Sequence, residues 1–272
     1  VAEGAEKVTI DGDVFGGGKG VANSFTCEKA MVGVVDDGAE VTGEGESATY
    51  TLKEGGTSVT IGNGTIGGSV FGGGEIGRVE RNTKVTIGIG NGTGGDKSPV
   101  IAGEVYGAGQ GVATHGYSGL VSGNSTLTIE GDAKIGHSVY GAGKMASLGR
   151  YWIATNKSEA TAHGVEIGMP WGLKCGGQST VIIRGYAEIG PNNMSMKAED
   201  GPDFDGNVFG AGKGILPYDN VGAEGPGRYY LKDGTYTWES YAGDDKEEAY
   251  LKYVETLGIT NNAIVTIGDN VF

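Results

Sequence analysis

A short phrase, a valine followed by an aromatic residue and a glycine-rich triplet, recurs six times along this chain of 272 residues. The copies begin at Val14, Val70, Val105, Val139, Val208 and, with only two residues left, Val271. A second phrase, Val-Thr-Ile or a close variant, precedes each copy and begins at Val8, Val59, Val85, Leu127, Val181 and Val265. A short repeated unit cannot bury its apolar face alone and has to stack on its neighbours. The repetition therefore predicts an elongated solenoid.

The unit with the clearest pattern spans residues 125–143. Leu127 and Ile129 alternate with polar residues, which is the pattern of a half-buried strand. Two shorter apolar segments end at Ile135 and Tyr140, and glycines separate all three segments. Glycine suits tight corners because it adopts positive φ without a Cβ clash. Three short strands with glycine corners predict one rung of a parallel β-helix, so the expected fold class is all-β.

Stacked rungs place equivalent residues above one another in columns. The first column of the expected core comprises Val8, Val59, Val85, Leu127, Val181 and Val265. The second comprises Ile10, Ile61, Ile87, Ile129, Ile183 and Ile267. Between them we expect an outward column that is rich in β-branched residues, as an exposed pleated sheet prefers. Its members are Thr9, Thr60, Thr86, Thr128, Ile182 and Thr266.

A further column is aromatic and comprises Phe15, Phe71, Tyr106, Tyr140, Phe209 and Phe272. If it faces inward it is a stabilising ladder, and if it faces outward it is a stripe able to hold a glycan or a protein partner. Neighbouring residues of a regular strand point to opposite faces, so the valine and the ring of one copy cannot both face inward unless the strand ends at a corner. We favour the ladder and leave the direction of the column open.

Composition excludes several classes of function. The formal net charge is −14, and such a surface repels phosphate backbones, so we expect no nucleic-acid partner. No apolar stretch reaches about 18 residues, so we expect no membrane-spanning segment. The 56 glycines follow no Gly-X-Y period, which excludes collagen. Cys27 and Cys175 fit no metal or redox spacing, and whether they pair is left open.

Irregular insertions interrupt the repeats. They lie approximately at residues 21–47, 145–178, 191–205 and 215–261 of a single β-helix domain that spans 1–272 and that we expect to be a fragment of a longer chain. In the last insertion, residues 228–238 predict a hairpin with Asp233-Gly234 as its two-residue turn. Residues 244–258 predict a helix, because Asp244 or Asp245 suits the N-cap and Gly258 suits the end of a helix.

The insertions also hold the candidate ligand-binding residues, since binding residues concentrate on loops that a rigid scaffold supports. We select five aromatic residues there: Trp152, Trp171, Trp238, Tyr151 and Tyr236. Two interpretations remain open. The rings form platforms that stack on sugars, or they form small hydrophobic cores beneath long loops, which is their more ordinary role.

An enzymatic function needs a different set of residues. A polysaccharide lyase needs a cationic base beside calcium-binding carboxylates, and a glycoside hydrolase needs carboxylates that face one groove. The closest candidates are Asp200, Asp203 and Asp205, with Arg184 and Lys213 as nearby cations. These carboxylates lie in a loop and do not recur in adjacent repeats, so we assign no catalytic residue. We also assign no metal ligand and no cofactor, with calcium as the one ion that the acidic surface leaves open.

The motifs Val-Thr-Ile-Gly, Ile-Gly and Gly-x-Val-Tyr/Phe-Gly-Gly/Ala-Gly together resemble the repeat of large adhesin-like surface proteins of host-associated gut bacteria. The resemblance covers the rungs, about half of the chain, and does not reach the insertions. It implies an extracellular or cell-surface, right-handed parallel β-helix, and the usual handedness of parallel crossovers agrees. Our leading hypothesis is therefore a non-catalytic adhesin-like or structural segment that binds a glycan or a host or microbial surface protein through its insertion loops or one exposed face. The alternatives are a polysaccharide lyase or glycoside hydrolase with a groove formed by the insertions, and a spacer between other domains.

Overall fold

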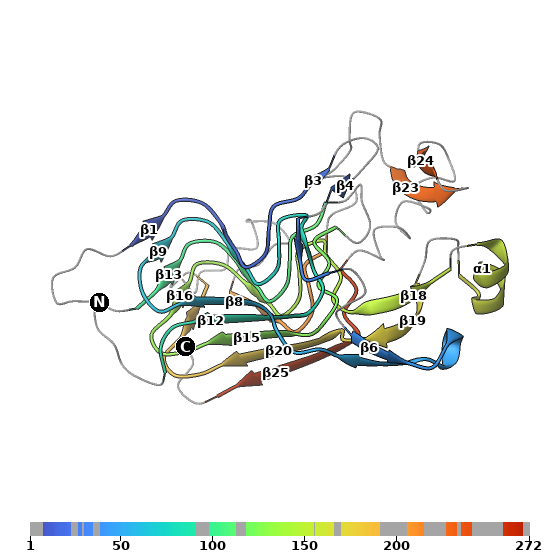
Figure 1. The fold of residues 1–272 in the computed structure, drawn as a ribbon. Helices are drawn as coiled ribbons and strands as arrows, with labels where there is room; N and C mark the ends of the chain where they lie inside the picture. The colour runs from blue at the N-terminus through green and yellow to red at the C-terminus, as the bar shows by residue number, and fades with distance from the viewer. Residues whose placement is uncertain are drawn as a thin grey trace.

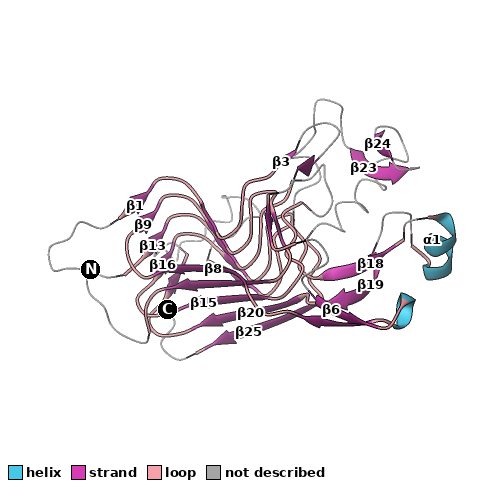
Figure 2. Cartoon of the chain, in the orientation of Figure 1, coloured by secondary structure: helices cyan, strands magenta, loops and turns pink. Residues whose placement is uncertain are grey.

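The structure, a computed structural model, describes residues 8–22, 27–28, 30–34, 39–90, 98–112, 118–154, 156–165, 170–190, 206–214, 227–232, 235–240 and 258–268. For residues 22, 27–28, 227–232 and 235–240 it describes the backbone only. Within these ranges the regular structure is β-strand, apart from one short α-helix and one 3-10 turn (Figure 2).

Three parallel sheets of five strands each form the body of the molecule. The long sheet contains β8 (Gly56–Ile61), β12 (Asn82–Ile87), β15 (Ser125–Ile129), β20 (Gln178–Ile183) and β25 (Asn262–Ile267). The middle sheet contains β1 (Thr9–Ile10), β9 (Thr65–Ile66), β13 (Val100–Ile101), β16 (Lys134–Ile135) and β21 (Glu188–Ile189). The aromatic sheet contains β2 (Val14–Phe15), β10 (Val70–Phe71), β14 (Val105–Tyr106), β17 (Val139–Tyr140) and β22 (Val208–Phe209).

The chain visits these sheets in a fixed order (Figure 1). From β8 in the long sheet it passes to β9 and then to β10, and it repeats this path from β12, from β15 and from β20. Glycines form the corners, and Gly131 after β15 and Gly185 after β20 both have positive φ, at 63° and 79°. Consecutive strands of each sheet pair in parallel and in register, as Val59 does with Val85. The predicted all-β class is confirmed, with parallel pairing in all three sheets.

The main hydrophobic core is built from the predicted columns of the long sheet together with apolar residues of the other two sheets. Val85, Leu127 and Val181 are fully buried, and they lie beside one another on adjacent strands. Ile87, Ile129 and Ile183 do the same one step further along the strands. Period-two alternation therefore predicted the buried face of this sheet correctly from β8 to β20. For β25 the prediction was wrong, because Val265 and Ile267 are 42% and 58% exposed on the last strand of the sheet.

The prediction for the first copy of the Val-Thr-Ile phrase was wrong, because this copy does not lie in the long sheet. Residues Thr9–Ile10 form β1 of the middle sheet and pair with Thr65–Ile66, so Val8 and Ile10 do not continue the columns of the long sheet. Val8 is 70% exposed. The spacing explains this, because Ile10 precedes Val14 by the same interval that separates Ile66 from Val70 in the next repeat.

The outward column of the long sheet is largely as predicted. Thr60 and Thr266 are exposed, and Thr86 and Ile182 are half-buried. Two members differ from the prediction: the side chain of Thr128 is buried, and Thr9 lies in β1 of the middle sheet.

The aromatic column forms a ladder of parallel rings. Phe15, Phe71, Tyr106, Tyr140 and Phe209 stack in that order, with adjacent ring centroids 4.7–4.9 Å apart. The rings of Phe71, Tyr106 and Tyr140 are buried in a cluster of their own, while the valines before them belong to the main core. The favoured interpretation, a structural ladder, is therefore confirmed, and valine and ring lie on different sides of the strand. Phe209, at one end, is 43% exposed.

Four hairpins lie in or next to the insertions among the described residues. They are β3 (Val21–Ala22) with β4 (Cys27–Glu28), β6 (Ala39–Thr42) with β7 (Thr49–Leu52), β18 (Arg150–Ile153) with β19 (Pro170–Cys175), and β23 (Gly227–Lys232) with β24 (Thr235–Ser240). The last of these confirms the predicted hairpin, whose turn residues 233–234 lie outside the described residues. Residues 244–257 of the predicted helix 244–258, the insertion at 191–205 and Phe272 of the aromatic column also lie outside them.

Other elements were not predicted. Between β18 and β19 the chain forms the helix α1 (Lys157–His163), and between β6 and β7 it forms the 3-10 turn η1 (Gly45–Ser47). A short parallel pair joins β5 (Met31–Val32) to β11 (Arg78–Val79). Cys175 is buried and free, and the side chain of Cys27 lies outside the described part.

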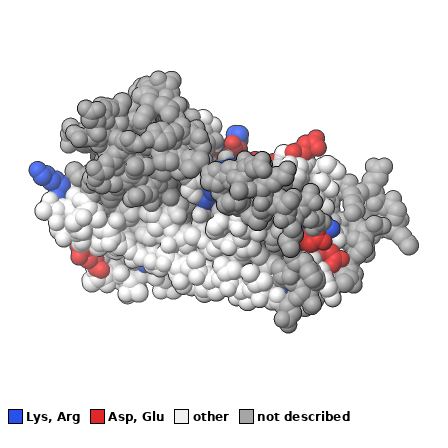
Figure 3. Space-filling model, turned by 180° about the vertical axis from the view of Figure 1, so that it is seen from behind, with Lys and Arg blue, Asp and Glu red and all other residues white. Residues whose placement is uncertain are grey.

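Two features of the whole molecule bear on its setting. None of the helices that the structure describes is both long and apolar enough to cross a bilayer. On the face seen from behind, the described surface is mostly uncharged, with Asp and Glu at its margins (Figure 3).

Candidate functional site

Two of the five predicted aromatic residues come together on the hairpin β18–β19. The rings of Trp152 and Trp171 stack with their centroids 5.7 Å apart and their planes 15° from parallel. Tyr50, on β7 of the neighbouring hairpin, meets Trp152 edge to face at 5.8 Å. We call Tyr50, Trp152, Trp171, His163 and Lys174 the aromatic cluster.

Helix α1 positions His163 in the aromatic cluster. The Asn156 side chain accepts a hydrogen bond from the amide of Glu159 at 3.0 Å and so caps the start of the helix, and Gly164, with a φ of 66°, ends it. The imidazole of His163 then lies face to face with Trp171, with ring centroids 3.6 Å apart. Its Nε2 lies 3.5 Å from Oε1 of Glu46, which links the helix to the other hairpin.

Lys174 completes the aromatic cluster with a cation–π contact. Its Nζ lies 4.1 Å from the centroid of the Trp152 ring and 5.7 Å from that of Tyr50. All five members are half-buried, and the rings contact one another and Lys174. These internal contacts favour the interpretation of a small core beneath the insertions and leave less ring surface for a sugar.

Of the other three predicted residues, Tyr151 lies outside the aromatic cluster and makes a contact of its own. The hydroxyl of Tyr151 donates to the backbone oxygen of Leu148 at 2.5 Å, and burial raises the pKa of Tyr151 to about 12. Its phenol therefore acts as a neutral donor that fixes the start of the hairpin to the segment just before it. Trp238 and Tyr236 lie on β24, where Trp238 pairs with Tyr229 and Tyr236 with Leu231, and their side chains lie outside the described part.

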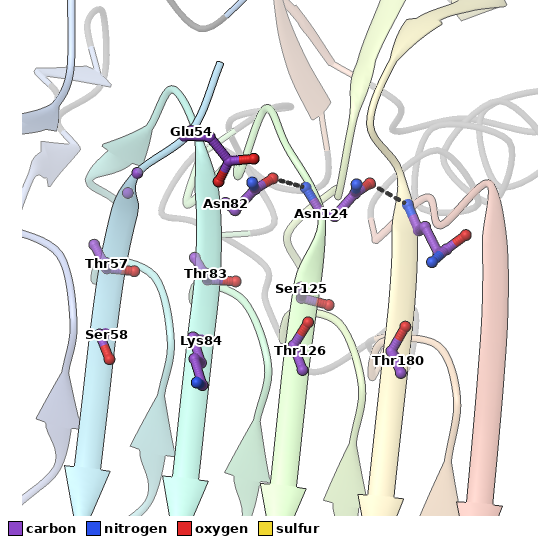
Figure 4. Close-up of a pocket in the computed structure, with 13 residues that line it drawn as sticks. Glu54, Thr57, Ser58, Asn82, Thr83, Lys84, Asn124, Ser125, Thr126 and Thr180 are labelled. Atoms are coloured by element: carbon purple, nitrogen blue, oxygen red, sulfur yellow. Dashed lines mark hydrogen bonds between the residues drawn. The ribbon is translucent and has the colours of Figure 1, made fainter. Parts of the chain in front are cut away.

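Sequence reasoning missed a polar groove that crosses the first residues of the long-sheet strands (Figure 4). It has a volume of about 450 Å³. Its lining is polar and comes from four neighbouring strands and the segment that precedes β8, as Figure 4 shows for its labelled residues. The lining residues are Glu54, Gly55, Gly56, Thr57, Ser58, Asn82, Thr83, Lys84, Asn124, Ser125, Thr126, Gln178 and Thr180.

One row of the lining follows the register of the sheet. Ser58 pairs with Lys84, Lys84 with Thr126, and Thr126 with Thr180, so each of four strands supplies one polar side chain. Adjacent strands lie about 4.8 Å apart, which sets the spacing of this row. These residues alternate with buried ones along their strands, so they belong to the outward face. The groove thus presents a regular row of hydrogen-bonding groups to the solvent.

A second row is made of amides and is partly used within the protein. Oδ1 of Asn82 accepts a hydrogen bond from the backbone amide of Asn124 at 2.9 Å, and Oδ1 of Asn124 accepts one from the amide of Gln178 at 3.0 Å. Because the oxygen is the acceptor in both bonds, this ladder does not consume the Nδ2 donors of the two asparagines. The Nδ2 groups of this row are therefore able to donate hydrogen bonds to a ligand.

The hydroxyls of the neighbouring inward column hold the scaffold together instead. Those of Thr57, Thr83 and Ser125 donate to the backbone oxygens of Gly72, Gly107 and Gly141 at 2.5, 2.6 and 2.5 Å. These bonds join the long sheet to the glycine-rich triplets across the rung. They give the groove a rigid floor.

Two charged residues, Glu54 and Lys84, lie in the lining. Near Lys84, the Glu130 carboxylate accepts hydrogen bonds from Arg184 Nη2 at 2.6 Å and from the Gly90 amide at 2.9 Å. Burial acts to raise the pKa of Glu130, but these bonds and the charges of Arg184 and Lys84 outweigh it and lower the pKa. Glu130 is therefore ionised at neutral pH.

The residues considered for catalysis are not brought together in the described part. Arg184 is paired with Glu130, and Lys213 is paired with Glu104, whose Oε1 lies 2.8 Å from its Nζ. Asp200, Asp203 and Asp205 lie outside the described residues. In the ranges that the structure describes, His, Cys, Asp and Glu side chains do not gather in threes as metal ligands would.

Comparison of the chain with known protein families, with curated proteins and with solved structures finds no match in any of the three.

Proposed function

We propose that this chain is a segment of a right-handed parallel β-helix on the outside of a bacterial cell, and that it binds a neutral glycan in the polar groove without cleaving it. The cyclic path through three parallel sheets supports the β-helix. The handedness rests on the crossover preference of parallel strands. The setting rests on the resemblance of the repeats to adhesin-like surface proteins.

The observation that carries the binding function is the in-register row Ser58, Lys84, Thr126 and Thr180 beside the amide ladder. Sugar hydroxyls both donate and accept hydrogen bonds, and hydroxyl and amide side chains do the same. A polymer of repeated sugar units suits a row of donors and acceptors that repeats at every strand. A small, rigid, mostly uncharged surface of this kind binds without reorganising.

Charge narrows the class of glycan. The chain carries a net charge of −14, which repels polyanionic polysaccharides at long range. Lys84 and Glu54 add one charge of each sign to the lining, so the groove itself has no strong preference for an anion. A neutral polysaccharide is therefore the expected ligand.

The aromatic cluster has a supporting role in this proposal. Only Gly176 and Gly177 separate β19 from Gln178, and Glu54 lies in the link from β7 to β8, so both hairpins rise from the border of the groove. Their mutual contacts make them a rigid wall beside it. A glycan that fills the groove would therefore meet Lys174 and the ring edges more readily than an open ring face.

The test is a screen of neutral and acidic polysaccharides for retention and for new reducing ends, with and without calcium. Thr126→Val and Thr180→Val remove one hydroxyl each at nearly constant shape, and loss of a hydrogen bond worth about 1 kcal/mol predicts roughly fivefold weaker binding. Thr60→Val is the matched control, because Thr60 is exposed on the same face of β8 but does not line the groove. Equal binding by all three variants would contradict the site, and released oligosaccharide would support the lyase or hydrolase alternative.

A further inference from the structure

The polar groove carries two rows of side chains whose spacing is fixed by the long sheet. The in-register row has one member on each of β8, β12, β15 and β20, and Figure 4 shows these members side by side across the strands. They are Ser58, Lys84, Thr126 and Thr180. The amide ladder of Asn82, Asn124 and Gln178 lies two residues earlier in sequence than the last three of them. A ligand that uses the whole groove has to match both rows.

The geometry of a sheet sets two distances for such a ligand. Neighbouring members of one row lie on adjacent strands, which are about 4.8 Å apart. The two rows are separated by two residues along each strand, which is about 7 Å. The groove therefore offers a grid with a short repeat across the strands and a longer separation along them.

An extended peptide does not match this grid. Its side chains face the same way at every second residue, so they recur at about 7 Å, whereas the row recurs at about 4.8 Å. A peptide laid across the strands would therefore lose register with the row after the first contacts. This mismatch favours a glycan over a protein segment as the ligand.

A chain of pyranose rings with β-1,4 linkages matches both distances. Its equatorial bonds leave from opposite ends of each ring, so successive rings stay in one line and each advances the chain by nearly the distance between two strands. Its hydroxyl groups project from the two edges of the ring, one edge toward each row. An axial linkage turns each ring away from the line of the ring before it, so an α-1,4-linked chain curls and leaves the grid.

The groove is also built to hold a straight chain in one position. The hydroxyls of Thr126 and Thr180 can both donate and accept, and the ladder leaves the Nδ2 donors of the asparagines unused. Arg81 Nη1 donates to the backbone oxygen of Glu54 at 2.6 Å, which fixes the segment that borders the groove before β8. Rigid groups that need no ordering on binding lower its entropic cost.

We propose that the ligand of the groove is a β-1,4-linked glycan that crosses the strands, with one sugar unit over each of β8, β12, β15 and β20. This inference rests on the function proposed above and adds the linkage and the direction of the bound chain. The chain then runs beside the wall that the two hairpins form at the start of these strands.

The first experiment is a calorimetric titration of the protein with oligosaccharides of two and four units. The β-1,4-linked probes contain glucose, mannose or N-acetylglucosamine, and α-1,4-linked glucose of the same lengths is the matched control. Two further units reach two further strands, and each hydrogen bond gained strengthens binding about fivefold. For at least one β-linked sugar the tetrasaccharide should therefore bind at least about tenfold more tightly than the disaccharide, and more tightly than the α-linked tetrasaccharide.

The second experiment tests the direction of the chain with substitutions at the two ends of the row. Ser58→Ala and Thr180→Val each remove one hydroxyl and should each weaken binding of the tetrasaccharide about fivefold. The disaccharide spans only two strands, so it can bind at the intact part of the row and should be nearly unaffected. Thr60→Val, which is exposed on β8 but does not line the groove, is the control, and circular dichroism checks that all variants are folded.

The outcomes separate this inference from the function on which it rests. Equal binding of α- and β-linked tetrasaccharides, no gain from two to four units, or an effect of only one of the two end substitutions would overturn the inference and leave glycan binding in place. No binding of any of these glycans would overturn both.

Discussion

Two serines of one column differ in a way that isolates a single hydrogen bond. Ser125 and Ser179 lie beside each other on β15 and β20, and both side chains are buried. Ser125 donates to the backbone oxygen of Gly141 at 2.5 Å, whereas the hydroxyl of Ser179 has no partner within the described residues. Substitution by alanine therefore removes the same atom from the same environment, with and without a bond.

The expected loss in free energy of unfolding depends on whether the substitution leaves a buried acceptor without its donor. Ser125→Ala leaves the Gly141 carbonyl oxygen without its hydroxyl donor in the interior, which costs about 1–3 kcal/mol in free energy of unfolding. Ser179→Ala removes a buried hydroxyl that is already unsatisfied, so its cost should be near zero or the change should stabilise. The difference between the two variants is then about 2 kcal/mol.

Urea unfolding followed by circular dichroism measures this difference. With a slope of about 2 kcal/mol per molar urea, the midpoint of Ser125→Ala should lie about 1 M below that of Ser179→Ala. Equal midpoints would refute the reasoning, because they would mean that the bond to Gly141 contributes nothing beyond the packing of the side chain. Ser125→Thr, which keeps the hydroxyl, serves as the control.

Two further predictions concern the ring ladder and the Glu130 pair. Phe71→Ala should lower the free energy of unfolding by about 3–5 kcal/mol, because the ring is fully buried. Phe209→Ala should lower it clearly less, because that ring is 43% exposed. Similar falls in melting temperature for the two variants would contradict the role of the ladder as a core. The pKa of Glu130 is lowered in the folded state, so its pairing with Arg184 stabilises the fold above pH 4.5 and is lost as the pH falls through the lowered value. The difference in free energy of unfolding between wild type and Arg184→Met should therefore become smaller below pH 4.5. Unfolding measured from pH 7 to pH 3 gives this difference, and a constant value would count against the ion pair.

Much of the scaffold could be predicted from the sequence, because each rung carries its information locally. The alternation of Leu127 and Ile129 with polar residues specifies a strand, and the glycine that follows specifies a corner. Neither signal depends on distant residues. The same rule misplaced Val8 and Ile10, because Val-Thr-Ile occurs in two sheets and only the interval to Val14 distinguishes them.

The helix α1 was missed although its end signals were present. Asn156 followed by Glu159 and then Gly164 is a pattern of helix start and stop, but the segment between is short and largely polar, so it shows no apolar periodicity. The sequence identified Trp152 and Trp171 as candidate aromatic residues, but it did not predict that their rings would contact each other. Their contact depends on how a hairpin closes around that helix.

The groove could not be predicted, since it exists only after the rungs are stacked. Asn82, Asn124 and Gln178 are separated by 42 and 54 residues in sequence, and they become neighbours through the register of three strands. Each residue taken alone is an ordinary polar residue at the start of a strand. The signal that was available is their equal distance from the Val-Thr-Ile phrase in successive repeats.

The glycine column at the rung corners has a consequence for how such a chain changes in length. A methyl group on Gly72 would collide with the backbone oxygen of Gly107, and one on Gly107 would collide with that of Gly141. Contact between successive rungs is therefore backbone against backbone at this corner and does not depend on which side chains lie elsewhere. A gene that encodes such rungs can gain or lose whole units by unequal recombination, and each new junction would already fit.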